Sequence, residues 1–301
     1  MSLQNPSFLI HCKVDLKKEG FFVFEIIKKE KLNDTVTKME LKAPRIAAKA
    51  LAGQFVILRV DALGERIPLT IADYNREAGT VTVIFQIVGG STQKLNGKEQ
   101  GDFIEDLVGP LGKPTHTQGL SKVAVIGGGV GCAIAYPVAK ALKENGATVH
   151  SVVGFRNADL VILENEFKKV SDKYIIMSDD GSAGEKGLVT DALKSLIEAG
   201  EKYDRVIAIG PLVMMKFVSL LTKEYNIPTV VSMNPIMIDG TGMCGGCRLT
   251  VGGETKFACV DGPEFDGHLV DFDEAISRSA QYKSAETHKR DENCNLMKGG
   301  N

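Results

Sequence analysis

Three of the six cysteines stand close together in the sequence, with a spacing that is typical of a metal centre. The stretch Asp239-Gly-Thr-Gly-Met-Cys244-Gly-Gly-Cys247 is followed by Cys259, which gives the pattern C-x2-C-x11-C. Between them, Gly252-Gly253 separates two strand-like segments and predicts a two-residue hairpin turn. That turn pairs Cys247 with Ala258, so Cys259 returns beside the first two cysteines and three thiols are expected to converge.

Four interpretations of this cysteine cluster compete. A disulfide is disfavoured, because the cysteines are few and nothing in the sequence indicates secretion. A structural zinc site usually has a second cysteine or histidine pair, and here His268 is the only histidine nearby in the sequence. A loop without metal is the simplest alternative. An iron–sulfur cluster is favoured by glycines that let backbone N–H groups turn toward the sulfurs, namely Gly240, Gly242, Gly245 and Gly246.

Asp239 is the expected fourth ligand of such a cluster. A plant-type [2Fe–2S] site has the spacing C-x4-C-x2-C and a distant fourth cysteine, and Asp239 stands where the first cysteine belongs. A carboxylate keeps the charge of a thiolate but is a harder ligand, so the site is expected to be more labile and more sensitive to pH. Two alternatives stay open: Asp239 is a turn residue, or Cys294 in the polar tail is the fourth ligand.

The bulk composition limits the class of protein. A chain of 301 residues exceeds one ordinary core and predicts two or three domains. A net charge of −2, with no tryptophan, gives no electrostatic or stacking case for nucleic-acid binding. Neither an uninterrupted apolar stretch of membrane-spanning length nor a signal peptide is recognisable, so we expect a cytoplasmic, reducing location.

The segment from 21 to about 115 predicts a small antiparallel β-barrel, after an extension (1–20) without usable periodicity. Six short apolar or alternating runs are predicted as strands: 22–29, 35–41, 54–60, 67–72, 80–87 and 103–107. Gly109-Pro-Leu-Gly112 predicts a tight turn that closes the barrel and begins the linker to the next domain.

Two segments of this barrel have residues suited to an anionic ligand. Arg66-Ile-Pro-Leu-Thr70 offers a cation, a rigid proline and a hydroxyl. The segment 85–95 runs from a strand through Gly89-Gly90 and two hydroxyl residues into a predicted helix, whose first turn presents N–H donors. Each signal is weak alone, because surface arginines and glycine-rich turns are common.

From Lys122 the pattern changes to that of a dinucleotide-binding domain. A buried-type strand (123–126), the turn Gly127-Gly-Gly-Val-Gly131 and an amphipathic helix (134–145) follow one another, which is the arrangement that holds a pyrophosphate. Cys132 stands where the third glycine of the motif belongs. Further strands predicted at 148–155, 174–178 and 205–210, with helices between them, indicate a doubly wound sheet.

The loops after those strands form the expected ligand side of the sheet. Asp179 and Asp180 would repel a 2′-phosphate and favour NAD(H) over NADP(H), whereas Arg156 argues the other way, and a solvated turn is the alternative for the two aspartates. The predicted nucleotide-binding residues are Gly127, Gly128, Gly129, Val130, Gly131, Gly154, Arg156, Asp179, Gly210, Pro211 and Met214. We divide the chain into residues 1–20, 21–115, 116–225 and 226–301, the last with the cysteine hairpin, a loop at 261–266 and a polar tail.

Taken together, these stretches resemble the ferredoxin–NADP reductase superfamily from residue 21 to 273. More narrowly, the chain resembles electron-transfer subunits with a C-terminal [2Fe–2S] domain, those of dihydroorotate dehydrogenase and, more closely, of NADH-dependent reduced ferredoxin:NADP oxidoreductase (sulfide dehydrogenase). The closer resemblance rests on the stretch 239–247 and on Phe257-Ala-Cys-Val-Asp-Gly-Pro-Glu-Phe-Asp266. A dihydroorotate dehydrogenase subunit would be expected to have cysteine at 239.

The resemblance implies that the barrel binds FAD. The family's R-x-Y-S/T element faces the flavin, so it implies that Leu69 replaces the aromatic residue, that Thr70 lies near the reactive nitrogen as the catalytic residue, and that Arg66 is displaced by one position. The implied FAD-binding residues are Arg66, Pro68, Leu69, Thr70, Phe85, Gln86, Ile87, Gly90, Ser91 and Thr92, and the implied cluster ligands are Asp239, Cys244, Cys247 and Cys259.

The function that follows is electron transfer from NADH through FAD and the cluster to a larger flavoprotein or iron–sulfur subunit. No stretch of the sequence resembles an organic-substrate pocket with acid and base residues, and the five histidines share no motif. The alternatives are the electron-transfer subunit of dihydroorotate dehydrogenase and a zinc-bearing binding module without redox activity.

Overall fold

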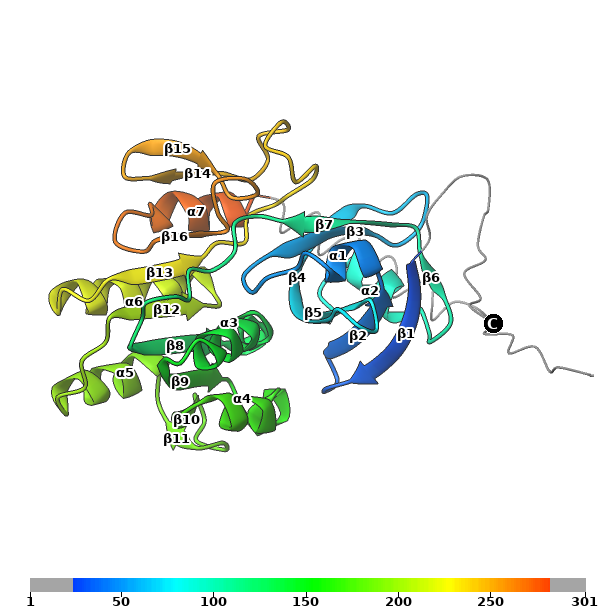
Figure 1. Cartoon of the computed structure of the whole chain (residues 1–301). Coiled ribbons are helices and arrows are strands. Elements are labelled where there is room, and N and C mark those ends of the chain that lie inside the picture. Colours follow the sequence, from blue (N-terminus) through cyan, green and yellow to red (C-terminus); the bar gives the residue numbers. More distant parts are fainter. Residues whose placement is uncertain (1–23, 282–301) are drawn as a thin grey trace, which may run out of the picture.

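The structure is a computed structural model and describes residues 24–281. Two large parts lie side by side, a β-barrel and an α/β domain, and a small two-stranded hairpin sits beyond the end of the α/β sheet (Figure 1). Some residues of the sequence lie outside the described part of the chain, namely the extension 1–20 with His11 and Cys12, and His288 and Cys294 near the other end.

The first part is a nearly closed antiparallel barrel in the order β6-β1-β2-β5-β4-β3-β7. Its alternating residues, among them Met39, Leu41, Val83 and Phe85, are buried in one apolar core. The strands are β1 (Phe24–Lys31), β2 (Val36–Lys42), β3 (Phe55–Arg59), β4 (Arg66–Asn75), β5 (Thr80–Gln86), β6 (Phe103–Ile104) and β7 (Asp106–Leu111), with the short helices α1 (Pro44–Ala47) and α2 (Gly90–Asn96).

The sequence prediction was wrong at the end of this barrel. The last predicted strand, 103–107, is instead two strands, β6 and β7, which are separated by Glu105. The predicted tight turn at Gly109-Pro-Leu-Gly112 is instead mostly strand, since β7 continues to Leu111 and Leu111 pairs with Phe55 of β3. A register shift in that pairing, beside a cis Gly109–Pro110 bond, accommodates the proline within an edge strand.

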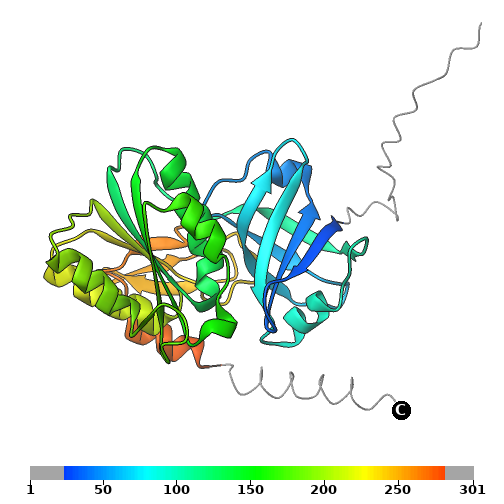
Figure 2. The same cartoon turned by 90° about the horizontal axis from the view of Figure 1, so that it is seen from below.

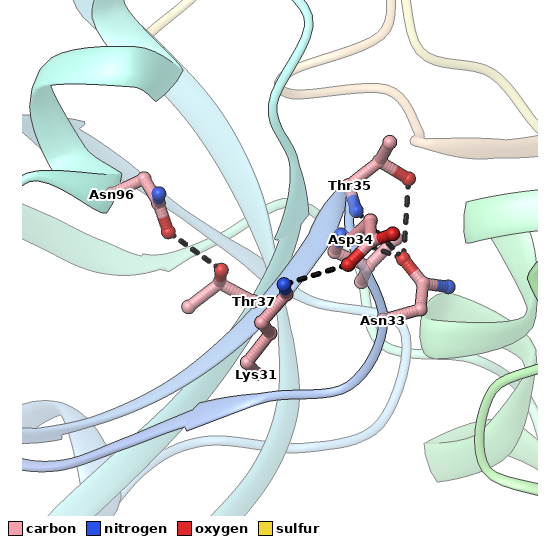
Figure 3. Close-up of polar contacts among 7 residues, drawn as sticks. Lys31, Asn33, Asp34, Thr35, Thr37 and Asn96 are labelled. Carbon is pink, nitrogen blue, oxygen red and sulfur yellow. Dashed lines mark hydrogen bonds and ion pairs between the residues drawn. The ribbon is translucent and has the colours of Figure 1, made fainter.

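Side-chain hydrogen bonds fix the ends of the barrel strands (Figure 3). Asn33 Oδ1 in the β1–β2 turn accepts hydrogen bonds from the N–H groups of Thr35 and Val36, both at 2.9 Å. Thr37 Oγ1 donates to Asn96 Oδ1 at 2.7 Å and so fastens α2 to β2. The helix that follows the Gly89-Gly90 segment is therefore held against the barrel wall.

The second part is a doubly wound α/β domain in the order β11-β10-β9-β8-β12-β13-β16. All its strand pairs are parallel except β13–β16, and helices cover both faces (Figures 1 and 2). The strands are β8 (Lys122–Gly128), β9 (Thr148–Phe155), β10 (Lys173–Ser178), β11 (Glu185–Lys186), β12 (Arg205–Ile209), β13 (Thr229–Ser232) and β16 (Glu264–Asp266). The helices are η1 (Gly129–Gly131), α3 (Cys132–Glu144), η2 (Ala158–Leu160), α4 (Glu164–Val170), α5 (Val189–Glu198), α6 (Leu212–Glu224) and the C-terminal α7 (Phe272–Ser279).

Two apolar cores, one on each face, hold this sheet between its helices. Apolar residues of α3 and α4 pack on one face, and those of α5 and α6 pack on the other. The predicted glycine turn at 127–131 is shorter than expected, because Gly127 and Gly128 belong to β8 and only the residues from Gly129 leave the sheet.

The α/β sheet extends past residue 225, the predicted domain boundary. β13 pairs with β12 in parallel, and β16 then adds at the edge in the antiparallel sense. The prediction of a loop over 261–266 was therefore wrong for its second half. The division of the chain at 225/226 stays a prediction, and the segments on either side of it share one sheet.

None of the helices described within residues 24–281 is both long enough and apolar enough to cross a lipid bilayer.

Candidate iron–sulfur site and flavin-facing cleft

The hairpin that carries the cysteines has the predicted register. β14 (Arg248–Val251) pairs with β15 (Glu254–Phe257) so that Val251 lies opposite Glu254. Gly252 and Gly253 both have positive φ, 61° and 80°, which the tight two-residue turn requires. Beyond the last strand pair, Ala258 N–H donates to Cys247 O at 3.1 Å, so Cys247 and Cys259 meet as expected.

The three cysteines of the cluster are free thiols gathered at one end of this hairpin. The Sγ atoms of Cys247 and Cys259 lie 3.2 Å apart, and both residues are buried, whereas Cys244 is exposed. Backbone N–H groups turn toward the sulfurs: Gly246 N lies 3.5 Å from Cys244 Sγ, and Cys259 N lies 3.4 Å from Cys247 Sγ. Burial beside the neighbouring thiol raises the pKa of Cys259 to about 12, so this thiol stays protonated without a metal.

Asp239 lies in the same loop and is held ionised. Its Oδ1 accepts a hydrogen bond from Thr241 N at 3.0 Å and its Oδ2 accepts one from Cys244 N at 2.8 Å. These N–H groups, that of Thr241 first, lower the pKa of the Asp239 carboxyl to about 2. Positive φ at Gly240 (76°), Gly242 (84°) and Gly245 (68°) bends the loop around the side chain, whereas Gly246 does not have the positive φ that we expected.

The donor types around this loop are those that a [2Fe–2S] centre uses. Across the described residues 24–281, no group of three or more histidine, cysteine or acidic side chains is placed to hold a metal ion. A [2Fe–2S] centre takes two protein ligands on each of two irons. Two adjacent buried thiols, with an exposed thiol and an ionised carboxylate on the neighbouring glycine-rich loop, supply four such donors. These four ligands stay a prediction.

A small cavity lies where the barrel, the α/β domain and the segment leading to the cysteines meet. Thr70 and Pro68 of β4 line it from the barrel, and Ile134 of α3 lines it from the α/β domain. The other lining residues are Phe55, Ser232, Met233, Asn234, Met237 and Pro263. Of these, only Pro68 and Thr70 were predicted, because 232–237 carries no local motif and reaches the cavity only through the sheet pairing of β13.

The other predicted FAD residues differ in their exposure and in their hydrogen-bond partners. Phe85 is 2% exposed and its side chain lies in the barrel core, so only its backbone is available for a ligand contact. Thr92 Oγ1 accepts hydrogen bonds from Val88 N and Gly89 N at 3.0 and 3.1 Å, so its hydroxyl caps α2. Ser91 Oγ donates to Glu65 at 2.8 Å. The half-buried Leu69, Gln86, Ile87 and Gly90 stay predicted contacts.

Arg66, an implied FAD-binding residue, has a partner within the protein. Its Nε donates to the backbone oxygen of Ile238 at 2.8 Å, directly before Asp239. The first residue of β4, the strand that is predicted to face the flavin, is therefore tied to the cysteine loop.

The nucleotide loop is closely packed under its glycines. A Cβ added to Gly131 would lie 2.6 Å from both Gly210 Cα and Ile209 O, so the helix start touches the end of β12 directly. Gly131, rather than the predicted third position at Cys132, is thus the glycine of close approach. Gly154 faces Val189 in the same way, with a Cβ contact at 2.6 Å. Val130, Pro211 and Met214 border this loop.

Loops after β9 and β10 are joined to each other at the predicted ligand side of the sheet. Ala158 N–H donates to Ser182 Oγ at 2.8 Å, and that hydroxyl donates to Asp180 at 2.6 Å. Arg156 and Asp179 are both exposed beside this link. The parallel pairing of β9 with β10 thus brings these two opposite charges to one edge of the sheet.

Two of the histidines, which share no motif in the sequence, form hydrogen bonds within the fold. His150 Nδ1 lies 2.9 Å from the Tyr203 hydroxyl inside the α/β domain, and His268 Nε2 lies 3.0 Å from Thr222 Oγ1. His116 is exposed in the linker.

Glu264 was missed by the sequence reasoning. It follows Pro263 of the small cavity, and its carboxyl accepts a hydrogen bond of 2.5 Å from Thr115 in the linker between barrel and α/β domain. Withdrawal from water raises the pKa of this carboxyl to about 7. No local pattern around an acidic residue in an apparent loop could have revealed this contact.

The raised pKa of Glu264 predicts a pH-dependent stability. Unfolding releases the proton at every pH between the unfolded value of 4.5 and the folded value of about 7, so the free energy of unfolding should fall as pH rises through this window. The loss is up to about 3 kcal/mol, at 1.36 kcal/mol per pKa unit. Urea unfolding at pH 4.5 and above pH 7 should show Glu264→Gln gaining stability relative to the wild type as pH rises. The exposed Glu77→Gln is the control, and equal pH profiles for all three proteins would refute the assignment.

Known proteins resemble this chain over most of its length. Residues 234–271 match the iron–sulfur cluster binding domain of dihydroorotate dehydrogenase B. A Thermotoga maritima homolog of the electron transfer subunit of dihydroorotate dehydrogenase B (NAD(+)) is 49% identical over 267 residues, which are 89% of this chain and 94% of that protein. The Bacillus velezensis electron transfer subunit of the same enzyme is 36% identical over 247 residues, 79% of this chain and 93% of that one.

A solved structure has the same fold throughout. A chain from the structure of NADH-dependent reduced ferredoxin-NADP oxidoreductase, determined for insight into flavin-based electron bifurcation, superposes with a TM-score of 0.85. The two chains are 47% identical, and the match covers 91% of this chain and 99% of the other. The predicted architecture of barrel, doubly wound domain and C-terminal iron–sulfur domain is confirmed by these similarities.

Proposed function

Since the chain belongs to the family of dihydroorotate dehydrogenase B electron-transfer subunits and their homologues, we propose that it passes electrons between NAD(H) and a larger partner subunit, through FAD and a [2Fe–2S] cluster. We place it with the reduced ferredoxin:NADP oxidoreductase type of complex. This placement is supported by the full-length match to a chain of such an enzyme and by aspartate, rather than cysteine, at position 239.

The observation that carries the proposal is the meeting of three parts at one small cavity. Thr70 comes from the barrel, Ile134 from the first helix after the nucleotide loop, and Met237 from the segment that enters the cysteine loop. Bound FAD supplies the exchange between a hydride and single electrons, and a bound [2Fe–2S] centre carries one electron at a time.

The residues of the chain position these groups and exclude water. Pro68 and Thr70 present the strand that is expected to face the flavin. Gly131 and Gly154 let the start of α3 and the end of β9 pack directly against Gly210 and Val189, beside the proposed dinucleotide site. The exposed Cys244 places the edge of the predicted cluster at the surface, where a partner subunit can take electrons. Free thiols at Cys132, Cys244, Cys247 and Cys259 support a reducing, cytoplasmic location.

The experiment is an anaerobic titration of the full-length chain, purified with its native cofactors. NADH should bleach the visible flavin bands and produce the electron paramagnetic resonance signal of a reduced [2Fe–2S] centre. Colourless protein that contains zinc would instead indicate the binding module. Co-purification of the partner from the native cell separates the two oxidoreductase types.

Asp179 provides a test of the cofactor preference. It lies at the end of β10, with its N–H bonded to Phe155 O at 3.1 Å, and its exposed carboxylate should repel a 2′-phosphate. We expect NADH to reduce the protein at least about tenfold more efficiently than NADPH, a difference of 1.4 kcal/mol.

Asp179→Asn should narrow that ratio by improving the use of NADPH while leaving the use of NADH unchanged. Asp159→Asn, another aspartate of the same ligand-side loops, is the matched control. A ratio of rate constants that stays the same in both variants would remove Asp179 from the specificity determinants.

A further inference from the structure

Three arginines from three separate elements hold the cysteine loop by its backbone. Arg66 of β4 donates from Nε to Ile238 O at 2.8 Å, and Arg248 of β14 donates from Nη1 to Gly245 O at 3.3 Å. Arg278 of α7 donates from Nη2 to Gly246 O at 3.5 Å. We call these three side chains the arginine collar.

The bonded carbonyls lie next to the predicted ligands in the chain. Ile238 precedes Asp239, and Gly245 and Gly246 fill the gap between Cys244 and Cys247. With their carbonyls held outward by guanidinium groups, the peptide units of this loop can present N–H groups inward. The peptide unit between Gly245 and Gly246 does so, because its N–H lies 3.5 Å from Cys244 Sγ.

The positive charges of the collar are not neutralised by side chains. Among the ion pairs within residues 24–281, none joins a carboxylate to Arg66, Arg248 or Arg278, whereas Arg59 of the same barrel is paired with Asp106 at 2.5 Å. The loop itself carries the carboxylate of Asp239, whose oxygens accept hydrogen bonds from Thr241 N and Cys244 N, and its thiols become thiolates when they bind iron. Three arginines with no carboxylate partner among the described residues thus contact the backbone of a loop whose predicted ligands are anionic.

Resting on the proposed function, we propose that the arginine collar positions the cluster loop against the flavin-binding barrel and makes the cluster bound there easier to reduce. Uptake of one electron adds one negative charge to the loop, and nearby uncompensated cations stabilise the reduced form. The step is a simple electron transfer: one electron leaves the flavin and one is taken up at the loop, with no bond made or broken at the loop.

The origin of the three arginines supports a positioning role. Arg66 begins the strand that also carries Pro68 and Thr70, so it links the flavin-facing strand to the loop in one step. Arg278 lies beyond the matched iron–sulfur domain, which ends at residue 271, and reaches back 32 positions to the loop. The C-terminal helix and the barrel therefore hold the loop from two sides.

The test is a redox titration of the cluster in the full-length chain, followed by electron paramagnetic resonance. Arg278→Gln and Arg66→Gln should each lower the ratio of reduced to oxidised cluster at a fixed potential by roughly tenfold, or 59 mV for one electron. Arg278→Lys, which keeps the charge, should retain most of the wild-type potential. Lys256→Gln removes a charge from the same hairpin that is paired with Glu254 instead of the loop, and should leave the potential unchanged.

The outcomes separate this inference from the proposed function. Full iron and sulfide content with the same midpoint potential in Arg278→Gln, Arg66→Gln and Lys256→Gln would overturn the collar alone. Wild-type protein without iron and sulfide would overturn the proposed function itself. If Arg66→Gln binds less iron, Arg278→Gln still reports the potential, and a wild-type midpoint potential in Arg278→Gln then refutes the inference. Arg66→Lys, which keeps the charge, should keep the wild-type potential.

Discussion

Replacing Cys247 or Cys259 by alanine is expected to abolish binding of iron and acid-labile sulfide while the rest of the chain stays folded. Both residues are buried, at 1% and 2% exposure, and their sulfurs are 3.2 Å apart, so either substitution removes one of the two buried thiols that the cluster needs. Iron content should fall to less than about a tenth of the wild-type value, since loss of even outer-sphere partners weakens metal sites 10–100-fold. Chemical iron and sulfide assays on anaerobically prepared protein measure this.

Cys132→Ala is the matched control for these variants. Cys132 is also a buried free cysteine, but it lies at the start of α3 in the α/β domain. It should keep full iron content, at a stability cost of about 1 kcal/mol for the lost sulfur. Asp239→Cys should also keep the cluster and Asp239→Ala should lose most of it. Full iron in Cys247→Ala and Cys259→Ala would show that the cluster loop has been misidentified.

Loss of the cluster should also separate reduction of the flavin from delivery of electrons to the partner subunit. With the cluster absent, NADH should still reduce the flavin, and the reduced flavin should pass its two electrons to two equivalents of the one-electron acceptor ferricyanide, because β14 and β15 form a sheet separate from the barrel and from the α/β sheet. Only delivery of electrons to the partner subunit should stop.

Local patterns predicted the parts of the molecule whose geometry is local. Gly252-Gly253 fixes the register of the cysteine hairpin by itself, because a two-residue turn allows one pairing of the flanking strands. The strand, glycine loop and helix from Lys122 to Glu144 likewise form one contiguous unit, and the helix was predicted to within a few residues. The contact between Cys247 and Cys259 was therefore predictable from spacing alone, and the convergence of Cys244 with them stays a prediction.

Features built from distant segments could not be predicted in this way. β16 becomes a strand only because it adds to the edge of β13, and the sequence from Asp261 to Asp266 has the glycine and proline of a loop. The same pairing brings Ser232 and Pro263 to the small cavity. The bond from Arg66 to Ile238 spans 172 positions, so the arginine was assigned to the nearest recognisable motif instead.

Gly131→Ala is expected to weaken NADH binding by about tenfold or more and to destabilise the α/β domain by about 1–3 kcal/mol, the usual cost of overpacking. The backbone of Gly131 has φ −59°, which alanine adopts freely, so the effect is purely steric. Its added Cβ would meet backbone atoms of Gly210 and Ile209 at 2.6 Å, and neither can rotate away as a side chain could. Thermal unfolding and NADH titration measure the two effects.

Gly146→Asn at the other end of α3 is the control, because Gly146 has no atom within 4 Å of its added Cβ and asparagine tolerates its φ of 87°. Gly131→Ala could instead bind NADH as tightly as the wild type and have the same melting temperature as Gly146→Asn. In that case the start of α3 does not depend on its direct backbone contact with β12, and the dinucleotide must be held elsewhere.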